Sequence, residues 1–115
     1  MVPSKTKNSI MGFMLSAFLK EKPGSGLCLV GQVSFETIVA TYQHGLSVLD
    51  RQMSPFTLDL SEVGNGDSSI LALLSAWIRY TMEHQKQLTL VQVPLSLRHL
   101  MQLSGLDTVF PIENK

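Results

Sequence analysis

The chain has 115 residues, of which 44% are hydrophobic and 16% are charged, and its formal net charge is zero. This composition is typical of one globular domain and excludes a disordered chain. The neutral balance offers no basic surface for nucleic acid. The single cysteine, Cys28, excludes a disulfide framework within the chain and favours a reducing compartment.

The N-terminal region combines basic residues with a short apolar run. Lys5 and Lys7 precede apolar residues 10–19, an order also found in signal peptides. The run is too short to span a bilayer, and no small-residue cleavage site follows it. We therefore expect a flexible N-terminal arm over residues 1–11 and a single domain over residues 12–115.

The first half of that domain is predicted to hold a hairpin, a helix and a strand. Residues 12–20 and 26–33 indicate two strands, joined by a turn-forming Glu-Lys-Pro-Gly-Ser sequence. A helix is expected from an N-cap at Ser34 to about residue 51, with Glu36 in its first turn. Its apolar face has helical spacing and comprises Phe35, Ile38, Val39, Tyr42, Leu46 and Leu49.

The second half alternates strands with helices. Strict alternation of apolar and polar residues predicts a strand over 56–60, and a second strand is expected over 88–93. A strongly apolar helix is expected over 67–85, and another helix from Pro94 to a stop at Gly105. Residues 108–112 favour a last short strand at a sheet edge, where Pro111 is tolerated.

This order of elements predicts the fold class. After the hairpin, strands and helices alternate, which is typical of an α/β domain with a mostly parallel sheet and right-handed crossovers. We expect a mixed sheet of four to five strands with three to four helices.

Few residues carry a pattern that indicates catalysis or metal binding. The three histidines, His44, His84 and His99, have no Cys, Asp or Glu at ligand spacing. Cys28 and Trp77 are expected in the core rather than in a site. Residues 64–67, Gly-Asn-Gly-Asp, precede a helix but lack the lysine of a phosphate-binding loop. We expect no enzyme activity, no cofactor and no metal.

The start of the predicted helix at Asp67 is the most informative segment. Asp67 can accept a hydrogen bond from a backbone N–H two or three residues on, which stabilises a helix by about 1 kcal/mol. This turn also lies at the carboxyl end of a strand, where open α/β sheets place their sites. A hydroxyl group at this place, such as that of Ser68, could also be phosphorylated.

Two blocks of sequence resemble the STAS domain family, named for sulfate transporters and anti-sigma factor antagonists. The first block is Leu-Asp-Leu-Ser-x-Val over residues 58–63 followed by Asp-Ser-Ser-x-Leu-Ala-Leu-Leu over 67–74. The second runs from Pro94 through leucines at every third position to Ser-Gly-Leu over 104–106. The resemblance covers roughly residues 13–112 and implies the STAS fold.

Within that family the chain looks most like MlaB, the STAS subunit of the Mla phospholipid ABC transporter. The residues that carry this likeness are Ala72-Leu73-Leu74-x-x-Trp77-x-Arg79 and 103–107, Leu-Ser-Gly-Leu-Asp. The resemblance implies a cytoplasmic, non-catalytic subunit bound to the transporter's ATPase, in a complex with a permease that maintains outer-membrane lipid asymmetry. It implies no membrane insertion by the chain itself.

The resemblance also implies a binding site and an alternative function. Ser68 takes the position of the family's small hydroxyl residue, which lies toward the ATPase. The surrounding residues expected to contact the partner are Asn65, Gly66, Asp67, Ser69 and Leu71. In the alternative, an anti-sigma factor antagonist, an anti-sigma kinase phosphorylates the residue corresponding to Ser68 and thereby switches partners.

Two departures from the family pattern favour constitutive docking over regulated phosphorylation. Ile70 stands where family members have glycine, so a β-branched side chain is expected to crowd the first turn of the helix. Residues 31–34 read Gly-Gln-Val-Ser, whereas the antagonists have Gly-Glu-Leu-Asp with two acidic residues.

Overall fold

The computed structural model describes residues 17–23, 26–64 and 67–113. Its elements follow the order β-β-α-β-α-β-α. They are β1 (Ala17–Glu21), β2 (Leu27–Gly31), α2 (Ile38–Asp50), β3 (Phe56–Asp59), α3 (Ser69–Glu83), β4 (Leu88–Val91) and α4 (Leu95–Leu103). The predicted order is confirmed, and the proposed arm over residues 1–11 lies outside the described residues.

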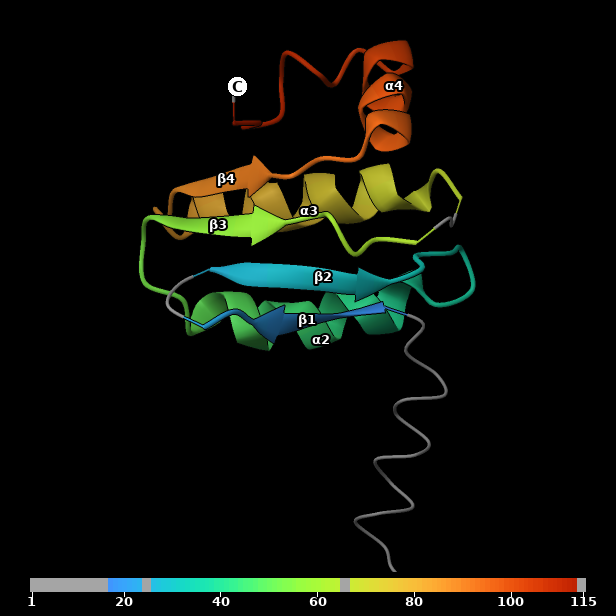
Figure 1. The fold of residues 1–115 in the computed structure, drawn as a ribbon. Coiled ribbons are helices and arrows are strands. Elements are labelled where there is room, and N and C mark those ends of the chain that lie inside the picture. The colour runs from blue at the N-terminus through green and yellow to red at the C-terminus, as the bar shows by residue number, and fades with distance from the viewer. Residues whose placement is uncertain (1–16, 24–25, 65–66, 114–115) are drawn as a thin grey trace, which may run out of the picture.

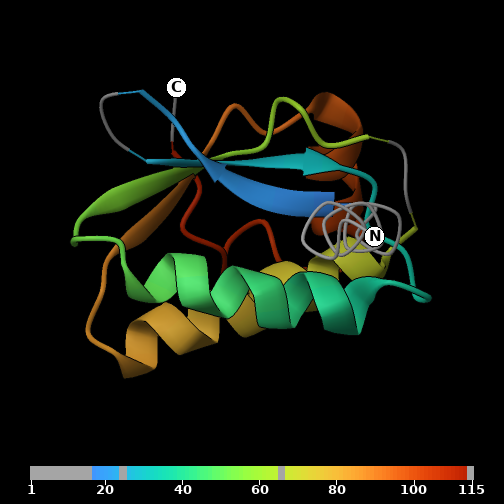
Figure 2. The same ribbon diagram turned by 90° about the horizontal axis from the view of Figure 1, so that it is seen from below.

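The four strands form one mixed sheet in the order β1-β2-β3-β4. β1 and β2 are an antiparallel hairpin, while β2, β3 and β4 are parallel. Helices α2 and α3 lie side by side on one face of the sheet, and α4 lies beyond β4 (Figures 1 and 2). This two-layer arrangement confirms the α/β class and brings the carboxyl ends of the parallel strands to the end where α2 and α3 begin.

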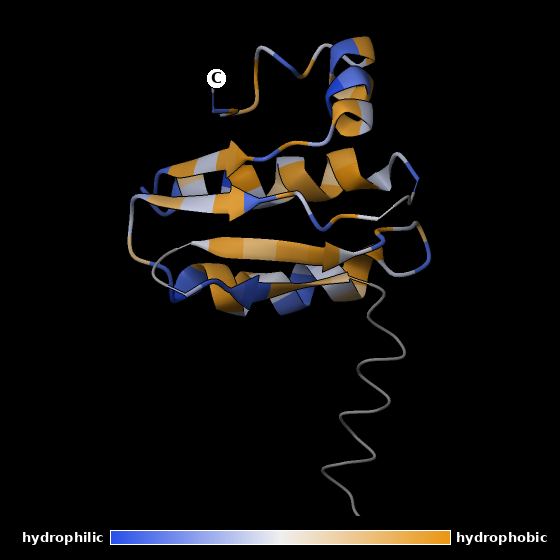
Figure 3. Ribbon diagram, in the orientation of Figure 1, coloured by the Kyte–Doolittle hydropathy of each residue, from blue (hydrophilic) through white to orange (hydrophobic). Residues whose placement is uncertain are grey.

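The core lies between the sheet and the helix pair. β2 is hydrophobic along its whole length, whereas the edge strand β1 ends in hydrophilic residues (Figure 3). Trp77 is fully buried on α3, and its indole N–H donates a hydrogen bond to the carbonyl of Tyr42 on α2 at 3.2 Å. Cys28 is 2% exposed. The predicted burial of both residues is therefore confirmed, although Cys28 lies on the other face of the sheet and outside the cluster that contains Trp77.

The predicted start of the first helix was wrong. α2 begins at Ile38 with Thr37 as its N-cap, because residues 35–37 form a turn closed by a hydrogen bond from the Thr37 N–H to the Ser34 carbonyl at 3.1 Å. Glu36 therefore precedes the helix. The apolar pattern also misled, since Phe35 is 71% exposed and Val39 is 64% exposed.

The C-terminal part follows the prediction except at its last segment. Pro94 is the N-cap of α4, and Gly105 follows the helix with a φ of 73°, a conformation that glycine adopts without strain. Residues 108–112 do not form a strand. Ile112 makes only a single parallel bridge to Leu90, in which the Leu90 N–H donates to the Pro111 carbonyl at 2.8 Å.

Candidate functional site

Asp67 ties the start of α3 to the loop before α2. One carboxylate oxygen accepts the backbone N–H of Ser69 at 2.9 Å and also the Ser69 hydroxyl. The other oxygen accepts the backbone N–H of Phe35 at 3.1 Å. The hydrogen bond from the Ser69 side chain, and then the backbone bonds, hold the pKa of Asp67 below its ordinary value. The predicted capping bond is thus confirmed, and the carboxylate is already engaged on both oxygens.

Ser68 occupies the N-cap position of α3, one residue later than predicted for the cap. It is exposed, and its side chain makes no capping hydrogen bond; the backbone N–H groups of Ile70 and Leu71, which an N-cap side chain would accept, donate to the carbonyls of Asp67 and Ser68. The hydroxyl group of Ser68 therefore faces solvent at the carboxyl-end edge of the sheet. A hydroxyl in this position is able to donate to, or accept from, a group on another molecule.

The other residues predicted for this site fall into two groups. Asn65 and Gly66 lie outside the described residues. Ser69 is 2% exposed and Leu71 is 8% exposed, so their side chains lie in the interior and shape the turn from within. Ile70 is also buried, at 5% exposure. Its β-branched side chain packs inward and forms part of the wall of the cavity beside Ser68, so it shapes the surface next to the turn.

A cavity of about 330 Å³ opens beside Ser68. It lies between the start of α3, the loop after β3 and the start of α4. Asp67, Ser68 and Ser96 supply its polar groups, and most of the remaining lining is apolar: Val33, Val63, Ile70, Pro94, Leu97 and Leu100. The combination suits an apolar side chain of a partner surrounded by hydrogen-bonding groups.

The described residues hold no group of three or more His, Cys, Asp or Glu that could bind a metal ion. The three histidines lie apart. His44 is half-buried on α2, His84 stacks on Tyr80 with ring centroids 4.0 Å apart, and His99 is exposed on α4.

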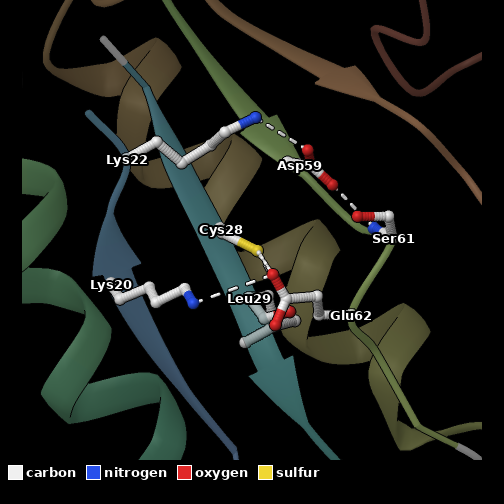
Figure 4. Close-up of polar contacts among 7 residues, drawn as sticks. All are labelled: Lys20, Lys22, Cys28, Leu29, Asp59, Ser61 and Glu62. Carbon is white, nitrogen blue, oxygen red and sulfur yellow. Dashed lines mark hydrogen bonds and ion pairs between the residues drawn. The ribbon is translucent and has the colours of Figure 1, made fainter. Parts of the chain in front are cut away.

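A polar cluster on the opposite face of the sheet escaped the sequence analysis (Figure 4). Lys22 donates to the carboxylate of Asp59 at 2.8 Å, and Asp59 also accepts the backbone N–H of Ser61 at 2.7 Å. Burial raises the pKa of Asp59, but the hydrogen bonds from Lys22 and Ser61 outweigh it and leave the pKa below the ordinary value. The alternating strand pattern hinted that Asp59 faces away from the helices, but nothing in the sequence paired it with Lys22.

The second half of this cluster surrounds Cys28. Its thiol lies 3.6 Å from a carboxylate oxygen of Glu62, which also lies 3.7 Å from the ammonium group of Lys20. Burial, and then the nearby carboxylates, raise the pKa of the Cys28 thiol. A thiol with a raised pKa is a poor nucleophile, in keeping with a structural role for Cys28.

Residues 18–112 match the family model described as "Mlab, STAS domain". The chain belongs to this family of STAS domains. No curated protein matches the chain. Among the residues that the structure describes, no helix is both long and apolar enough to cross a membrane.

Solved structures share the fold over most of the chain. A chain of the Acinetobacter MlaFEDB complex in its ATP-bound Vtrans2 conformation, its MlaB subunit, is 26% identical with a TM-score of 0.69. The match covers 82% of this chain and 99% of that subunit. An anti-sigma factor antagonist from Mycobacterium paratuberculosis is 25% identical with a TM-score of 0.65, covering 86% of this chain and 85% of the other.

A third structure shows likeness of fold alone. The anti-sigma factor antagonist domain protein from Planctomyces limnophilus is 17% identical, with a TM-score of 0.63. The match covers 86% of this chain and 91% of that protein. The STAS fold expected from the sequence blocks is therefore confirmed, and relatives of both expected branches share it.

Proposed function

We propose that this STAS domain is a non-catalytic accessory subunit of an Mla-type phospholipid ABC transporter. It binds the ATPase of the transporter and stabilises or regulates it, within a complex that contains a permease and maintains outer-membrane lipid asymmetry. The domain acts in the cytoplasm and stays at the inner membrane through its partner. The match to the Mlab family over residues 18–112 and the likeness to the MlaB subunit support this proposal.

The observation that carries the proposal is the exposed hydroxyl of Ser68 at the rim of the cavity. Because Asp67 is already hydrogen-bonded through both carboxylate oxygens, docking here does not bury an unmatched charge. A partner carbonyl can accept the Ser68 hydroxyl while a partner apolar side chain fills the cavity. Such a pocketed anchor with a polar rim is typical of protein–protein interfaces.

An anti-sigma factor antagonist that switches partners through phosphorylation of Ser68 is the second candidate. The exposure of that hydroxyl and the likeness to the Mycobacterium paratuberculosis antagonist favour it. A phosphate would add about 1.5 to 2 negative charges beside the carboxylate of Asp67, and the repulsion would weaken docking. The partner in that case is an anti-sigma factor kinase.

Co-purification from the native host separates the two functions. Tagged parent, Ser68→Ala and Ser68→Arg chains are expressed at equal levels, and bound proteins are identified by mass spectrometry. We expect the ATPase and permease with the parent and with Ser68→Ala, and their loss with Ser68→Arg, because a buried unpaired charge weakens an interface by several kcal/mol. Ser104→Arg, the same change at an exposed site after α4, is the matched control and should retain both partners.

One result would contradict the transporter proposal, and another would contradict the place proposed for its interface. Recovery of an anti-sigma kinase together with phosphate on Ser68 would favour partner switching. Undiminished binding of the ATPase by Ser68→Arg would show that the start of α3 is only a helix cap and that the interface lies elsewhere.

A further inference from the structure

An apolar groove runs between α2 and α3 on the side of the helix pair away from the sheet. Its lining is entirely apolar apart from the tyrosine hydroxyl: Ile38, Val39, Tyr42, Ala72, Leu73 and Ala76. The groove has a volume of about 190 Å³, and Val39 on its wall is 64% exposed. Phe35, 71% exposed, precedes it on the chain. Exposed apolar side chains beside an apolar groove make this face a candidate binding surface.

The chain enters the fold at the end of the domain where this groove lies. Ala17 begins β1 opposite Gly31, and its carbonyl accepts a hydrogen bond from the Thr41 hydroxyl on α2 at 3.5 Å. Thr41 lies one turn after Ile38 in the groove wall. β1 starts at the same end of the domain as α2 and α3 (Figures 1 and 2).

The sixteen residues before Ala17 contain an apolar segment of suitable length. Over residues 10–15 every residue but Gly12 is large and apolar: Ile10, Met11, Phe13, Met14 and Leu15. Extended chain from Ala17 reaches about 13 Å to Phe13 and about 23 Å to Ile10. A helix with its side chains is about 10–12 Å across, so the path from the sheet side of α2 around to the groove is roughly half its circumference, about 16–19 Å. Ile10 and Met11 are far enough from Ala17 along the chain to cover that distance, whereas residues 13–15 are long enough only to cover the flank of α2.

We propose that residues 10–15 pass around α2 and that Ile10 and Met11 bind in the groove between α2 and α3. Removal of two facing apolar surfaces from water drives the association, and the covalent link keeps the segment at high effective concentration. Charge does not oppose it, because residues 1–16 contain no acidic residue and the groove contains no charged side chain. The proposal is independent of the transporter function. Ala72 lies one turn after Ser68 on α3, so the bound segment would border the face that carries Ser68.

Disulfide trapping tests where the segment lies. In a Cys28→Ala background, Ile10→Cys is combined with Ala72→Cys in the groove. The control pair combines Ile10→Cys with Glu62→Cys on the opposite face of the sheet. Glu62 is close to the point of entry, since its carbonyl accepts the N–H of Gly31, the residue paired with Ala17. The control pair therefore asks whether the segment reaches the opposite face of the sheet, close to its point of entry, as readily as it reaches the groove.

We expect the groove pair to form an intramolecular disulfide at least about tenfold faster than the control pair, because docking raises the effective concentration of the two thiols. Equal rates for the two pairs would overturn the proposal. Disulfide-linked dimers as the main product of the groove pair would also overturn it and assign the groove to a second copy of the chain. Melting curves of both double variants show whether they remain folded.

A second measurement avoids changes within the described fold. Ile10→Ser with Phe13→Ser should increase the fluorescence of a dye that binds apolar surface, because the groove becomes free. Lys5→Ser with Lys7→Ser is the control and should leave the fluorescence unchanged. Equal fluorescence of the parent and the apolar-segment variant would refute the docking of residues 10–15.

Discussion

Gly45 on α2 and Trp77 on α3 are in such close contact that no side chain fits between them. A Cβ atom on residue 45 would come within 2.3 Å of Cζ2 of the indole. The indole N–H in turn donates to the Tyr42 carbonyl, three residues earlier on α2. The glycine that weakens α2 as an isolated helix is therefore what lets the two helices pack around the only tryptophan of the chain.

We expect Gly45→Ala to destabilise the fold, although alanine is the better helix former. The gain in helix propensity is about 1 kcal/mol. Overpacking a filled core costs about 1–3 kcal/mol, and the rigid indole cannot move aside without disturbing its hydrogen bond. Urea denaturation should show a lower midpoint for Gly45→Ala. Gln43→Ala, an exposed change on the same helix, is the control, and a Gly45→Ala midpoint above that of the parent would contradict the packing argument.

The Lys22–Asp59 pair predicts a pH-dependent stability. Asp59 has a pKa below its ordinary value of 3.8, so its stabilising effect is complete above about pH 3.8 and is lost as pH falls through the lower, folded-state value. Asp59→Asn should therefore lower the free energy of unfolding at pH 7 by about 1–2 kcal/mol, through loss of charge-assisted hydrogen bonds. The difference in the free energy of unfolding between Asp59→Asn and the parent should shrink as the pH falls below about 3.8.

Denaturant unfolding at pH 7 and pH 3 measures this effect. Glu62→Gln, on the same face of the sheet, is the control because its pair with Lys20 is exposed on both sides, and exposed pairs contribute little. A constant gap between Asp59→Asn and the parent at both pH values would show that the carboxylate charge is not the cause.

The cap of α3 can be tested separately from partner binding. Asp67→Ala removes the hydrogen bonds to the N–H groups of Ser69 and Phe35 and should lower the melting temperature. Ser68→Ala should leave stability unchanged, because the Ser68 side chain makes no capping bond. Thermal melts of the two variants compare them directly. Equal melting temperatures would mean that Asp67 does not stabilise the turn.

The sequence predicted the elements better than their contacts. The strand at β3 and the long helix α3 followed from apolar periodicity, since burial on one face leaves a regular pattern. That same periodicity failed at Phe35 and Val39, because an apolar stripe marks burial against some partner and not necessarily against the chain's own core. The start of α2 was missed because Ser34 and Thr37 are both N-cap formers, and the hydrogen bond from the Phe35 N–H to the distant Asp67 leaves no local signal in the sequence.

At the candidate site the sequence located the turn but not the direction of each side chain. Asp67 and Ser68 are where the pattern indicated, while Ser69 and Leu71 point inward. The cavity beside Ser68 could not be foreseen, because it joins Val63 after β3 with Leu97 and Leu100 on α4, which are far apart in the sequence. Contacts between distant segments, such as Lys22 with Asp59, leave no local signal.

The lack of catalysis expected of this domain is open to direct measurement. Calorimetric titration of the isolated chain with ATP should give no saturable heat, because residues 64–67 lack a phosphate-binding lysine and the carboxylate of Asp67 repels an anion at the start of α3. Titration of Asp67→Asn is the matched control for that repulsion. Saturable binding by the parent in the micromolar range would overturn the non-catalytic assignment or require a nucleotide-binding role.

Lys86, in the connection between α3 and β4, is hydrogen-bonded to the end of α2. Its ammonium group donates to the carbonyls of Leu49, Asp50 and Gln52 at 3.0, 2.7 and 2.7 Å. These carbonyls lie at the negative end of the helix dipole, where a cation is stabilising. Lys86→Met keeps most of the aliphatic stem but removes the charge and all three hydrogen bonds.

We expect Lys86→Met to lower the free energy of unfolding by about 1.5–3 kcal/mol, the range for hydrogen bonds made by charged groups. Arg51→Met is the matched control, since it removes an exposed cation at the same end of α2 and should change stability by less than about 0.5 kcal/mol. Guanidinium denaturation compares the two variants with the parent. Salt screens partly buried contacts much less than exposed ones, so the short hydrogen bonds of Lys86 should persist at the high ionic strength of this denaturant. If both variants unfold at the same denaturant concentration, the three carbonyls find water in place of Lys86 and the link contributes nothing to stability.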